Sequence, residues 1–256
     1  MQIVAVQMKM AWEDKTANHR RLRELLAQTS VQPGALVIVP EMFETGFSMN
    51  VKATAQSEAR EGELLLRELA RQYDSAVMGG VASPIVDGAS RNECVAFAPD
   101  GSELVRYQKM HPFTLTGEDK HYPAGDSHRL FQWQGIKIAP FICYDLRFPE
   151  LFRPAVMQGA ELITLIACWP AKRSEHWVRL LQARAIENLA CVVGVNRCGD
   201  EPNLLFDGRS SAFDHMGVSL FEASEQEQVI THQNDIEATR RWSSKFPALR
   251  DIRLDV

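Results

Sequence analysis

Three stretches of this sequence each place a reactive side chain at or just past the end of an apolar segment. Glu41 ends ALVIVPE, Lys109 follows LVRYQ, and Cys143 follows IKIAPFI. In α/β sheets the ends of strands are where ligand sites gather. Taken singly, each residue has an ordinary explanation, because a glutamate can cap a segment, a lysine can be solvated and a cysteine can fill a core. Taken together, they predict a reactive site.

The chemistry that this group predicts is acyl transfer. A thiol becomes a nucleophile when a base removes its proton, and a nearby carboxylate can act as that base. An ammonium group stabilises the thiolate and then the oxyanion of a tetrahedral intermediate. The backbone N–H of Tyr144, directly after Cys143 at the start of an expected helix, is a second candidate donor to that oxyanion. Such a site requires no histidine.

The elements that must position these residues alternate between strands and helices. The sequence predicts apolar strands at 2–8, 35–41, 75–83, 161–170 and 191–199. It predicts helices at 18–30, 57–74, 149–160 and 174–190. It predicts hairpins at 91–110 and 128–145, final strands within 209–224 and 226–235, and then a polar tail. Because runs such as LVIVP and LITLIA must be buried on both faces, we expect an α/β fold with sheets covered by helices. If the hairpin-rich middle forms a second sheet, the two sheets can stack with helices outside.

Length and composition limit the possible classes of protein. The chain has 256 residues and shows no linker, repeat or low-complexity segment, so we expect one domain spanning 1–256. The net charge of −5, without a basic patch, argues against a nucleic-acid partner. No apolar run approaches the ~18 residues needed to cross a bilayer, and MQIVAVQMKM lacks the pattern of a secretion signal. We therefore expect a cytoplasmic protein without a membrane partner.

Nothing in the sequence predicts a metal or a cofactor. The cysteines are odd in number and match no zinc spacing, which also argues against a disulfide framework. His111, His121 and His128 share one loop-rich stretch but not a spacing that converges on a metal. No glycine-rich loop precedes a helix in the manner of a phosphate-binding site. We expect neither group to be bound.

The stretches VIVPEMFETGF, YQKMHPF and FICYDLRFPE, in this order, resemble the nitrilase or carbon–nitrogen hydrolase superfamily. The resemblance extends through WPAKRSEHW, QARAIENLACVVGVNRCG and GRSSAFDHMG, and so covers nearly the whole chain. It implies a four-layer αββα sandwich and assembly as a homodimer or a larger homo-oligomer. It also implies roles for three residues: Glu41 as general base, Lys109 as a partner of the oxyanion, and Cys143 as the residue that forms a thioester.

The resemblance implies a fourth catalytic residue as well. Glu118, in TLTGEDKHYPAG, matches a second glutamate that follows the lysine in such enzymes and orients the lysine and the substrate amide. The alternative is that Glu118 is an ordinary carboxylate in a loop.

Within the superfamily, PEMFETGFSM, CYDLRFPE and WPAKRSEHW most resemble the ω-amidase branch. That branch hydrolyses the terminal amide of 2-oxo acids such as 2-oxoglutaramate and 2-oxosuccinamate. Bacterial members are associated with methionine salvage, where they clear the 2-oxo amide left by a glutamine transaminase. One departure is Cys168, because related enzymes often have asparagine before the Trp-Pro pair; this position bears on substrate preference within the superfamily.

The carboxylate of a 2-oxo acid amide needs a cationic partner, and Arg173 is our candidate because a guanidinium binds a carboxylate in a bidentate way. The alternative is an ion pair with a neighbouring helix. Phe43, Phe47 and Trp169 are candidate pocket walls, although aromatic residues near strand ends are often plain core. A further pair, Arg184 and Glu187, shares one helical face at i, i+3 and is interpreted as structural or interfacial.

Two other readings of the sequence remain open. One is a different carbon–nitrogen hydrolase: a nitrilase, an N-carbamoyl amide hydrolase or an amidase for deaminated glutathione. The other is a binding module that keeps the fold but has no activity. The presence of Glu41, Lys109 and Cys143 argues against the second.

Overall fold

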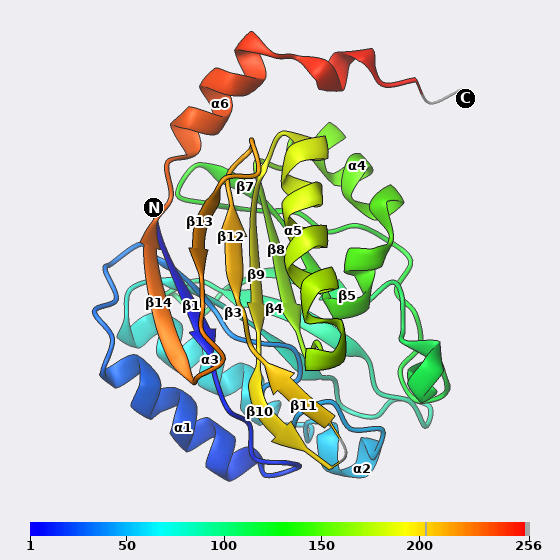
Figure 1. The fold of residues 1–256 in the computed structure, drawn as a ribbon. Coiled ribbons are helices and arrows are strands. Elements are labelled where there is room, and N and C mark those ends of the chain that lie inside the picture. The colour runs from blue at the N-terminus through cyan, green and yellow to red at the C-terminus, as the bar shows by residue number, and fades with distance from the viewer. Residues whose placement is uncertain (203, 254–256) are drawn as a thin grey trace.

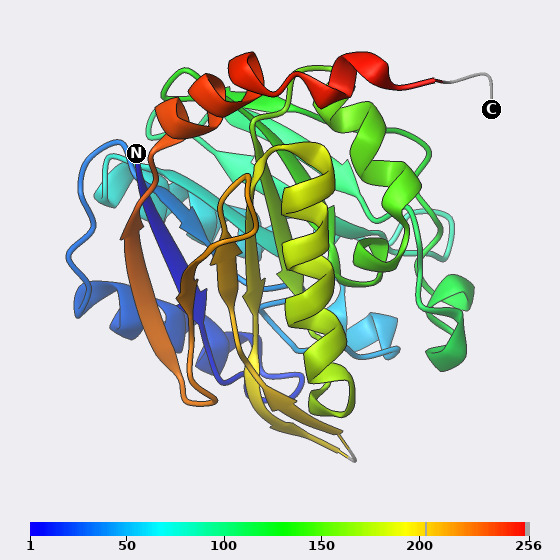
Figure 2. The same ribbon diagram turned by 45° about the horizontal axis from the view of Figure 1, so that its top comes forward.

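Two six-stranded sheets lie face to face, and helices cover the outer face of each (Figure 1). The computed structural model describes residues 1–202 and 204–253. Residues 203 and 254–256, which the predicted domain 1–256 includes, lie outside the described part. Figure 2 shows the C-terminal segment, in red, crossing the top of the two sheets.

The first sheet has three parallel strands at its centre. Its order is β14 (Gln228–Gln233), β1 (Gln2–Gln7), β2 (Leu36–Ile38), β3 (Ala76–Ala82), β4 (Asn92–Phe97) and β5 (Glu103–Gln108). Strands β1, β2 and β3 are parallel, and the outer strands join them in antiparallel pairs. Glu41 and Lys109 follow β2 and β5, so both belong to this sheet.

The second sheet repeats this arrangement. Its order is β13 (Ser219–Glu222), β12 (Ser211–Phe213), β9 (Cys191–Asn196), β8 (Leu162–Ala167), β7 (Ile136–Ile142) and β6 (Phe131–Trp133). Strands β7, β8 and β9 are parallel, and the other three join them in antiparallel pairs. Cys143 directly follows β7, so the nucleophile candidate comes from the opposite sheet to Glu41 and Lys109.

Alternation along the strands of the first sheet explains the layers. Ile3, Ala5, Leu36 and Ile38 belong to a core shared with the second sheet, whereas their neighbours Val4 and Val37 belong to a core shared with two outer helices. Those helices are α1 (Lys15–Ala27) and α3 (Glu61–Gln72). On the other side, α4 (Pro149–Met157) and α5 (Ser174–Asn188) cover the second sheet. The predicted four-layer αββα sandwich is confirmed.

The two predicted hairpins do not form the second sheet together. Residues 91–110 supply β4 and β5, which extend the first sheet from β3, whereas 128–145 supplies β6 and β7 of the second sheet. The physical reason is pairing with non-local neighbours, since β7 lies parallel to β8 and not beside β5. A hairpin pattern fixes its own two strands but not the sheet that they join.

Capping side chains shift the predicted helix ends. The first helix begins at Lys15 because Asp14 accepts a hydrogen bond from the Ala17 N–H. The second begins at Glu61 instead of residue 57, because Ser57 bonds to the Glu61 carboxylate and Arg60 adopts a left-handed φ of 54°. Residues 57–60, which were predicted to begin the second helix, form a turn instead.

Several elements were not expected from the sequence. The polar tail contains the helix α6 (Ile236–Lys245), which Asp235 caps and in which only Ile236 and Thr239 are buried. A separate two-stranded hairpin is formed by β10 (Cys198–Glu201) and β11 (Leu204–Asp207). The short pieces are α2 (Val51–Thr54), η1 (Thr114–Thr116), η2 (Glu118–Lys120), η3 (Cys143–Arg147), η4 (Ala171–Arg173) and η5 (Ala248–Asp251). No helix in the described part of the chain is both long enough and apolar enough to cross a membrane.

Candidate active site

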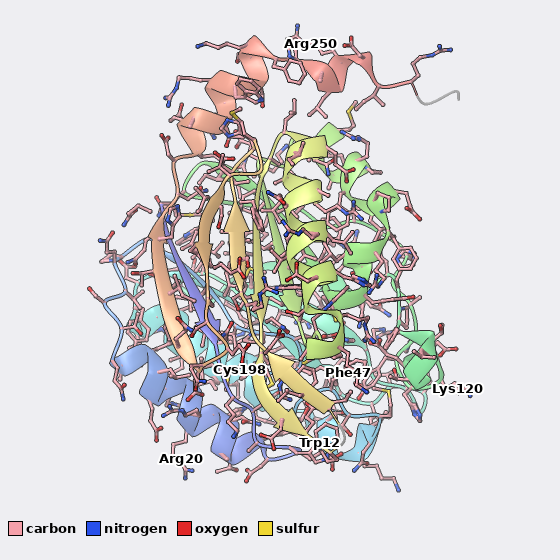
Figure 3. All side chains as sticks on the ribbon, viewed as in Figure 1. Trp12, Arg20, Phe47, Lys120, Cys198 and Arg250 are labelled. Carbon is pink, nitrogen blue, oxygen red and sulfur yellow. The ribbon has the colours of Figure 1, made fainter. Side chains whose placement is uncertain are left out.

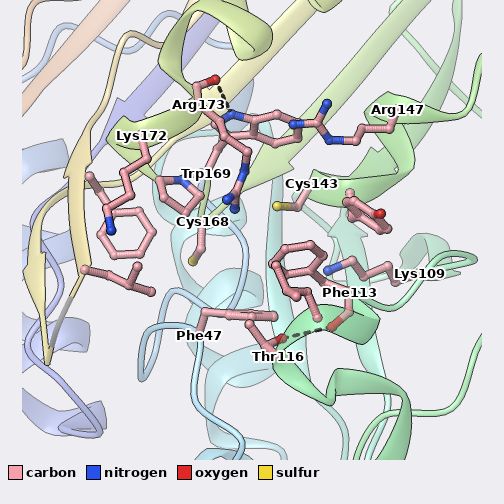
Figure 4. Close-up of a pocket in the computed structure, with 15 residues that line it drawn as sticks. Phe47, Lys109, Phe113, Thr116, Cys143, Arg147, Cys168, Trp169, Lys172 and Arg173 are labelled. Atoms are coloured by element: carbon pink, nitrogen blue, oxygen red, sulfur yellow. Dashed lines mark hydrogen bonds between the residues drawn. The ribbon is translucent and has the colours of Figure 1, made fainter.

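The three strand ends singled out in the sequence meet at one place. Lys109 Nζ lies 2.9 Å from Glu41 Oε1, and both the lysine and the glutamate alter the pKa of the Cys143 thiol. Lys109 and Cys143 line a pocket of about 210 Å³. Figure 4 shows the Cys143 thiol and the Arg173 guanidinium facing this same space. Residues 41, 109 and 143 therefore form a single site between the two sheets.

Glu41 is brought to the site by a close approach of two backbones. Beyond β2 the chain runs against Gly80 of β3, where Gly80 N–H donates to Pro40 O and Phe43 N–H donates to Gly80 O. A Cβ at Gly80 would lie 2.5 Å from Glu41 Cα. Met42 then turns the chain with a φ of 46°. A side chain at position 80 would therefore displace the glutamate.

Lys109 is a fully buried cation held by two carboxylates. Its Nζ donates to Glu41 Oε1 at 2.9 Å and to Glu118 Oε1 and Oε2 at 3.0 and 2.9 Å. Glu118 is also buried, and its Oε2 accepts a hydrogen bond from the Phe113 N–H at 2.6 Å. Glu118 is therefore part of the polar cluster and not a solvated loop carboxylate.

Cys143 occupies a strained turn. It is the first residue of η3 and has a φ of 45°, in the left-handed region that residues other than glycine seldom adopt. Asp145 fixes this turn, because its Oδ2 accepts from the Ile142 N–H and the Tyr107 hydroxyl while its Oδ1 accepts from the His111 N–H. These bonds join the turn after β7 to the end of β5. The backbone geometry presents the thiol toward the other sheet.

The electrostatics of the cluster keep the lysine charged and the thiol protonated. Burial opposes the charge on Lys109, but Glu118 and Glu41 outweigh it and raise the pKa of the lysine well above its ordinary value. Burial and, next, the Glu41 carboxylate raise the pKa of the Cys143 thiol well above its ordinary value, against the effect of Lys109. The resting thiol therefore needs a base, and Glu41 lies beside it.

The pocket has an aromatic side and a cationic side. The apolar lining comes from Phe47, Phe113, Leu115, Trp169, Leu204 and Phe206. Arg147, Lys172 and Arg173 supply positive charge, and the Arg147 and Arg173 guanidinium groups lie over the rings of Trp169 and Phe113. Among the residues that the structure describes, no carboxylate pairs with any of these three cations. An anionic ligand would supply the missing negative charge.

Most of the residues predicted to contact the substrate line the pocket. Tyr144, Trp169, Arg173 and Phe47 line the pocket. Tyr144 is the second residue of η3, a short 3₁₀ turn that is separate from the α-helix beginning at Pro149. The first N–H groups of such a turn have no partner within it. The backbone N–H of Tyr144 is thus in the position expected of an oxyanion donor.

Phe43 differs from the prediction, because it is not among the pocket-lining residues. Its ring is fully buried in the core between the first sheet and α1, stacked on His19 with ring centroids 5.9 Å apart. The turn at Met42 directs this side chain away from the site. Phe47, four residues later, forms the aromatic wall instead.

The interpretation of Arg184 and Glu187 as a structural pair agrees with the structure. Arg184 Nη1 donates to Glu187 Oε1 at 2.9 Å, and Nη2 donates to the Leu146 carbonyl at 2.8 Å. The arginine is buried beneath η3 and is not a pocket residue. It supports the turn that contains Cys143.

Cys168 contacts Glu41 mainly through its backbone. Its N–H donates to Glu41 Oε2 at 2.8 Å, and its thiol donates weakly to the Glu41 carbonyl at 3.2 Å. Because the stronger bond comes from the main chain, a different residue at position 168 can keep it. The side chain of Cys168 also lines the pocket.

Sequence reasoning missed several site residues. Asn92, at the start of β4, donates to both Glu41 and Glu118. On the hairpin β10–β11, Leu204 and Phe206 form part of the pocket wall, and no periodic pattern pointed to them. Arg147 could have been found, since it lies four residues after Cys143 in the stretch that drew attention first.

A buried ion pair supports the aromatic wall from behind. Arg197 and Glu201 are bonded to each other, and the Glu201 carboxylate accepts a hydrogen bond from the Phe47 N–H at 3.1 Å. The Arg197 guanidinium lies 4.4 Å from the centroid of the Phe206 ring. The pair thus contacts two walls of the pocket without lining it.

Comparisons with known proteins agree with this architecture. The profile of the carbon-nitrogen hydrolase family matches residues 2–244. The chain is 37% identical over 255 residues to an omega-amidase of Yersinia enterocolitica, covering 98% of this chain and 96% of the relative. It is 28% identical to a 2-oxoglutaramate amidase of Bacillus subtilis, with 99% and 98% covered.

A solved structure shows the same arrangement of elements. A CN-hydrolase superfamily protein from Xanthomonas campestris, described with an arsenic adduct in its active site, matches with a TM-score of 0.93 and 32% identity, covering 100% of this chain and 98% of that one. The likeness thus extends from the motifs to the whole sandwich. The chain belongs to the carbon-nitrogen hydrolase family.

Proposed function

We propose that this protein is an ω-amidase, which hydrolyses the terminal amide of 2-oxo dicarboxylic acid monoamides such as 2-oxoglutaramate and 2-oxosuccinamate. One observation carries the proposal. A thiol beside the Lys109–Glu41 pair opens into a small pocket in which Arg147, Lys172 and Arg173 have no acidic partner among the described residues. The pocket thus combines an acyl-transfer group with a place for a carboxylate. Relatives named omega-amidase and 2-oxoglutaramate amidase support this choice.

In the proposed reaction Cys143 forms a thioester. Glu41 takes the proton of the thiol as sulfur bonds to the amide carbon, and Lys109 Nζ and the Tyr144 N–H stabilise the oxyanion. The C–N bond breaks as Glu41 gives its proton to the leaving nitrogen, which departs as ammonia. Glu41 then takes a proton from water, whose oxygen bonds to the acyl carbon. The C–S bond breaks and the proton returns to sulfur.

The acid end of the substrate would face the cationic side of the pocket. Arg173 and Arg147 supply two guanidinium groups, which suit a carboxylate and its neighbouring 2-oxo oxygen. Phe47, Trp169 and Phe206 would contact the methylene groups between the two ends. Glu118 would keep Lys109 charged and oriented toward the amide.

The experiment is a substrate panel with ammonia release as the measurement. It compares 2-oxoglutaramate and 2-oxosuccinamate with the uncharged analogue butyramide, a nitrile, an N-carbamoyl amino acid and deaminated glutathione. We expect the highest kcat/KM for one of the two 2-oxo amides. A higher kcat/KM for any of the last three would replace the proposal with a nitrilase, an N-carbamoyl amide hydrolase or a deaminated glutathione amidase.

An inactive binding module of the same fold is the remaining alternative. Iodoacetamide labelling followed by peptide mass mapping tests it, because a module without catalysis should not label Cys143 faster than a free thiol of the same exposure. We expect Cys143 to label faster in the wild type than in Glu41→Gln, where the base is removed while the thiol keeps its place. Equal slow labelling together with no ammonia release would favour the module.

We also propose that the chain acts as one catalytic domain in the cytoplasm and assembles as a homodimer or larger homo-oligomer. The free cysteines support a reducing compartment.

Ile186 of α5 lies against the β12–β13 turn, where Met216 and Val218 are also exposed. Together the three side chains form an apolar surface suited to a second copy of the chain. Sedimentation of the wild type and of Ile186→Glu tests this, with a monomeric wild type contradicting it. We also propose a place in methionine salvage, which the resemblance to bacterial ω-amidases supports.

A further inference from the structure

Asn92 makes a closed set of hydrogen bonds with the charged residues of the site. Its Nδ2 donates to Glu41 Oε1 at 2.8 Å and to Glu118 Oε1 at 2.9 Å. Lys109 Nζ donates to the same two oxygen atoms at 2.9 and 3.0 Å. The Asn92 carbonyl also accepts the Lys109 backbone N–H at 2.9 Å. The neutral amide therefore duplicates the contacts of the ammonium group.

The orientation of this amide is fixed by its neighbours. Asn92 is buried, and its Oδ1 has no hydrogen-bond partner among the described residues. Rotating the amide would place Oδ1 against two carboxylate oxygens, and would leave both of them with one donor fewer. The side chain thus directs both of its N–H groups to the carboxylates and leaves its own oxygen unpaired.

The two oxygens of Glu41 are consequently different. Each carboxylate oxygen has two lone pairs for hydrogen bonds. Oε1 accepts from Lys109 and from Asn92, so both of its positions are occupied. Among the described residues, Oε2 accepts from the Cys168 backbone N–H, and the Cys143 thiol also bonds to the Glu41 side chain. Lys109 and Asn92 both bond to Oε1, so the second position on Oε2 can receive the proton of that thiol.

We infer that Asn92 is a positioning residue for the base, which together with Lys109 saturates Glu41 Oε1 and leaves Oε2 as the atom that exchanges the proton. The inference rests on the proposed reaction. In that reaction Oε2 takes the proton from Cys143 Sγ, gives it to the leaving ammonia, and takes one again from water. Throughout these steps Oε1 keeps its two donors, so the carboxyl group does not rotate and its proton returns to one place.

Other charged and titratable groups also act on Glu41. Lys109 and Glu118 are bonded in the cluster, Cys143 lies at its open side, and Cys168 lies behind it. Tyr122 and Glu201 are near enough for the Glu41 charge to act on them, and Arg197 is paired with Glu201. Replacing Asn92 leaves all of these groups in place, so a change in pH dependence can be assigned to the lost amide.

The test compares Asn92→Ala and Asn92→Asp with the wild type. We expect Asn92→Ala to lower kcat by about 10- to 100-fold, since the base is no longer held in place, while KM changes within about two-fold. The acid limb of the kcat/KM profile should move to higher pH, because the ionised carboxylate loses a donor. Asn92→Asp keeps the shape but adds a third carboxyl group, so its acid limb should move further.

The matched control is Asn188→Ala. Asn188 is equally buried in α5, and it also leaves its amide oxygen unpaired while its Nδ2 donates to the Arg184 carbonyl and to Glu187 Oε1, far from Glu41 in the sequence. We expect its pH profile to match that of the wild type. If the acid limb of Asn92→Ala stays at the wild-type position in a folded protein, or if Asn188→Ala moves it as much, the inference is overturned.

A second readout separates this inference from the substrate assignment. The pH dependence of Cys143 alkylation by iodoacetamide follows proton transfer to Glu41 and needs no amide substrate. We expect the midpoint of this dependence to lie at higher pH in Asn92→Ala than in the wild type and Asn188→Ala. A shifted midpoint in a protein that hydrolyses no 2-oxo amide would support the role of Asn92 and reject the proposed substrates. An unshifted midpoint would reject the role of Asn92 whatever the substrate.

Discussion

Cys143 has two features that a cysteine filling a core does not need. Its φ of 45° places a residue other than glycine in the left-handed region, at a cost of about 1–3 kcal/mol. Its thiol lies beside the Glu41 carboxylate, whose charge raises the pKa of that thiol further than burial alone. Strain and an adjacent base are both expected of a nucleophile. The other cysteines with raised pKa values include Cys94, where burial is the sole cause.

Replacing the nucleophile should separate activity from folding. We expect Cys143→Ala to lower ammonia release by more than about 10³-fold, since the thioester cannot form. The melting temperature should change little, because alanine removes only the sulfur atom and keeps Cβ. Cys191→Ala, a buried cysteine of β9 outside the pocket, should keep wild-type turnover. Ammonia release by Cys143→Ala at the wild-type rate would contradict the mechanism.

The unpaired arginines of the pocket predict a dependence on substrate charge. For 2-oxoglutaramate we expect Arg173→Met or Arg147→Met to raise KM by about 10- to 100-fold, the value of a lost hydrogen bond between charged groups. For butyramide, which has no carboxylate, KM should change little. Steady-state kinetics with the two substrates measures the difference. Arg179→Met, an exposed arginine of α5 paired with Glu175, serves as the control. A similar rise for both substrates would indicate damage to the pocket.

At the scale of elements, the site is made by the turns that follow three strands. The turn after β2 contains Glu41, the end of β5 contains Lys109, and η3 after β7 contains Cys143. Asp145 joins the last two turns, and Gly80 of β3 admits the first. The reactive groups therefore depend on backbone fit as much as on their own side chains.

Two adjacent glycines of β3 provide a matched test of that fit. We expect Gly80→Ala to lower kcat by about 10²-fold, because its Cβ must push the Glu41 backbone out of place. Gly79 faces the opposite side, where a Cβ would lie 3.2 Å from Val39 Cβ and 3.4 Å from Leu66 Cδ1. Gly79→Ala should therefore affect thermal stability more than kcat. Equal losses of kcat in two folded variants would show that Gly80 has no special role.

At the scale of the whole molecule, the two sheets supply different parts of the site. Glu41, Asn92 and Lys109 belong to the first sheet, and Cys143 and Cys168 follow strands of the second. The Cys168 N–H bond to Glu41 Oε2 and the Tyr107 bond to Asp145 cross between them. The site therefore forms only when the two sheets are packed against each other.

Ion pairs outside the site predict how the stability of the whole fold depends on pH. Burial opposes the charge on Glu61, but hydrogen bonds from its own backbone N–H, Ser57 and Lys15 outweigh it and lower its pKa to about 2. A carboxylate with a lowered pKa contributes stability above its unfolded value of 4.5, and that contribution is lost as pH falls toward 2. Urea unfolding should show Glu61→Gln less stable than the wild type at pH 6. The difference should shrink steadily below pH 4.5.

The neighbouring glutamate provides the control for that measurement. Glu58 is exposed just before α3, so Glu58→Gln should track the wild type across the same pH range. If the deficit of Glu61→Gln stays constant down to pH 2, the stabilising bonds of Glu61 do not depend on its charge.

The sequence by itself determined the layers and the family, and it singled out three candidate reactive residues. Alternation and apolar runs are local properties, and motifs such as FICYDLRFPE are contiguous, so they can be read without coordinates. The helix ends were less certain because caps such as Asp14 and Ser57 decide them. The helix α6 was missed because only two of its residues are buried.

Only the tertiary structure decided which groups meet. Glu41 and Lys109 are 68 positions apart, and Glu41 and Cys168 are 127 apart, yet each pair is hydrogen-bonded. Asn92 gave no signal because its two partners come from other turns, and Phe43 was misplaced because one positive φ at Met42 reverses the direction of its side chain. A sequence pattern shows only which face of its own helix or strand a residue lies on. The contacts of a site depend on how distant segments are oriented toward each other, which the packing of the two sheets sets.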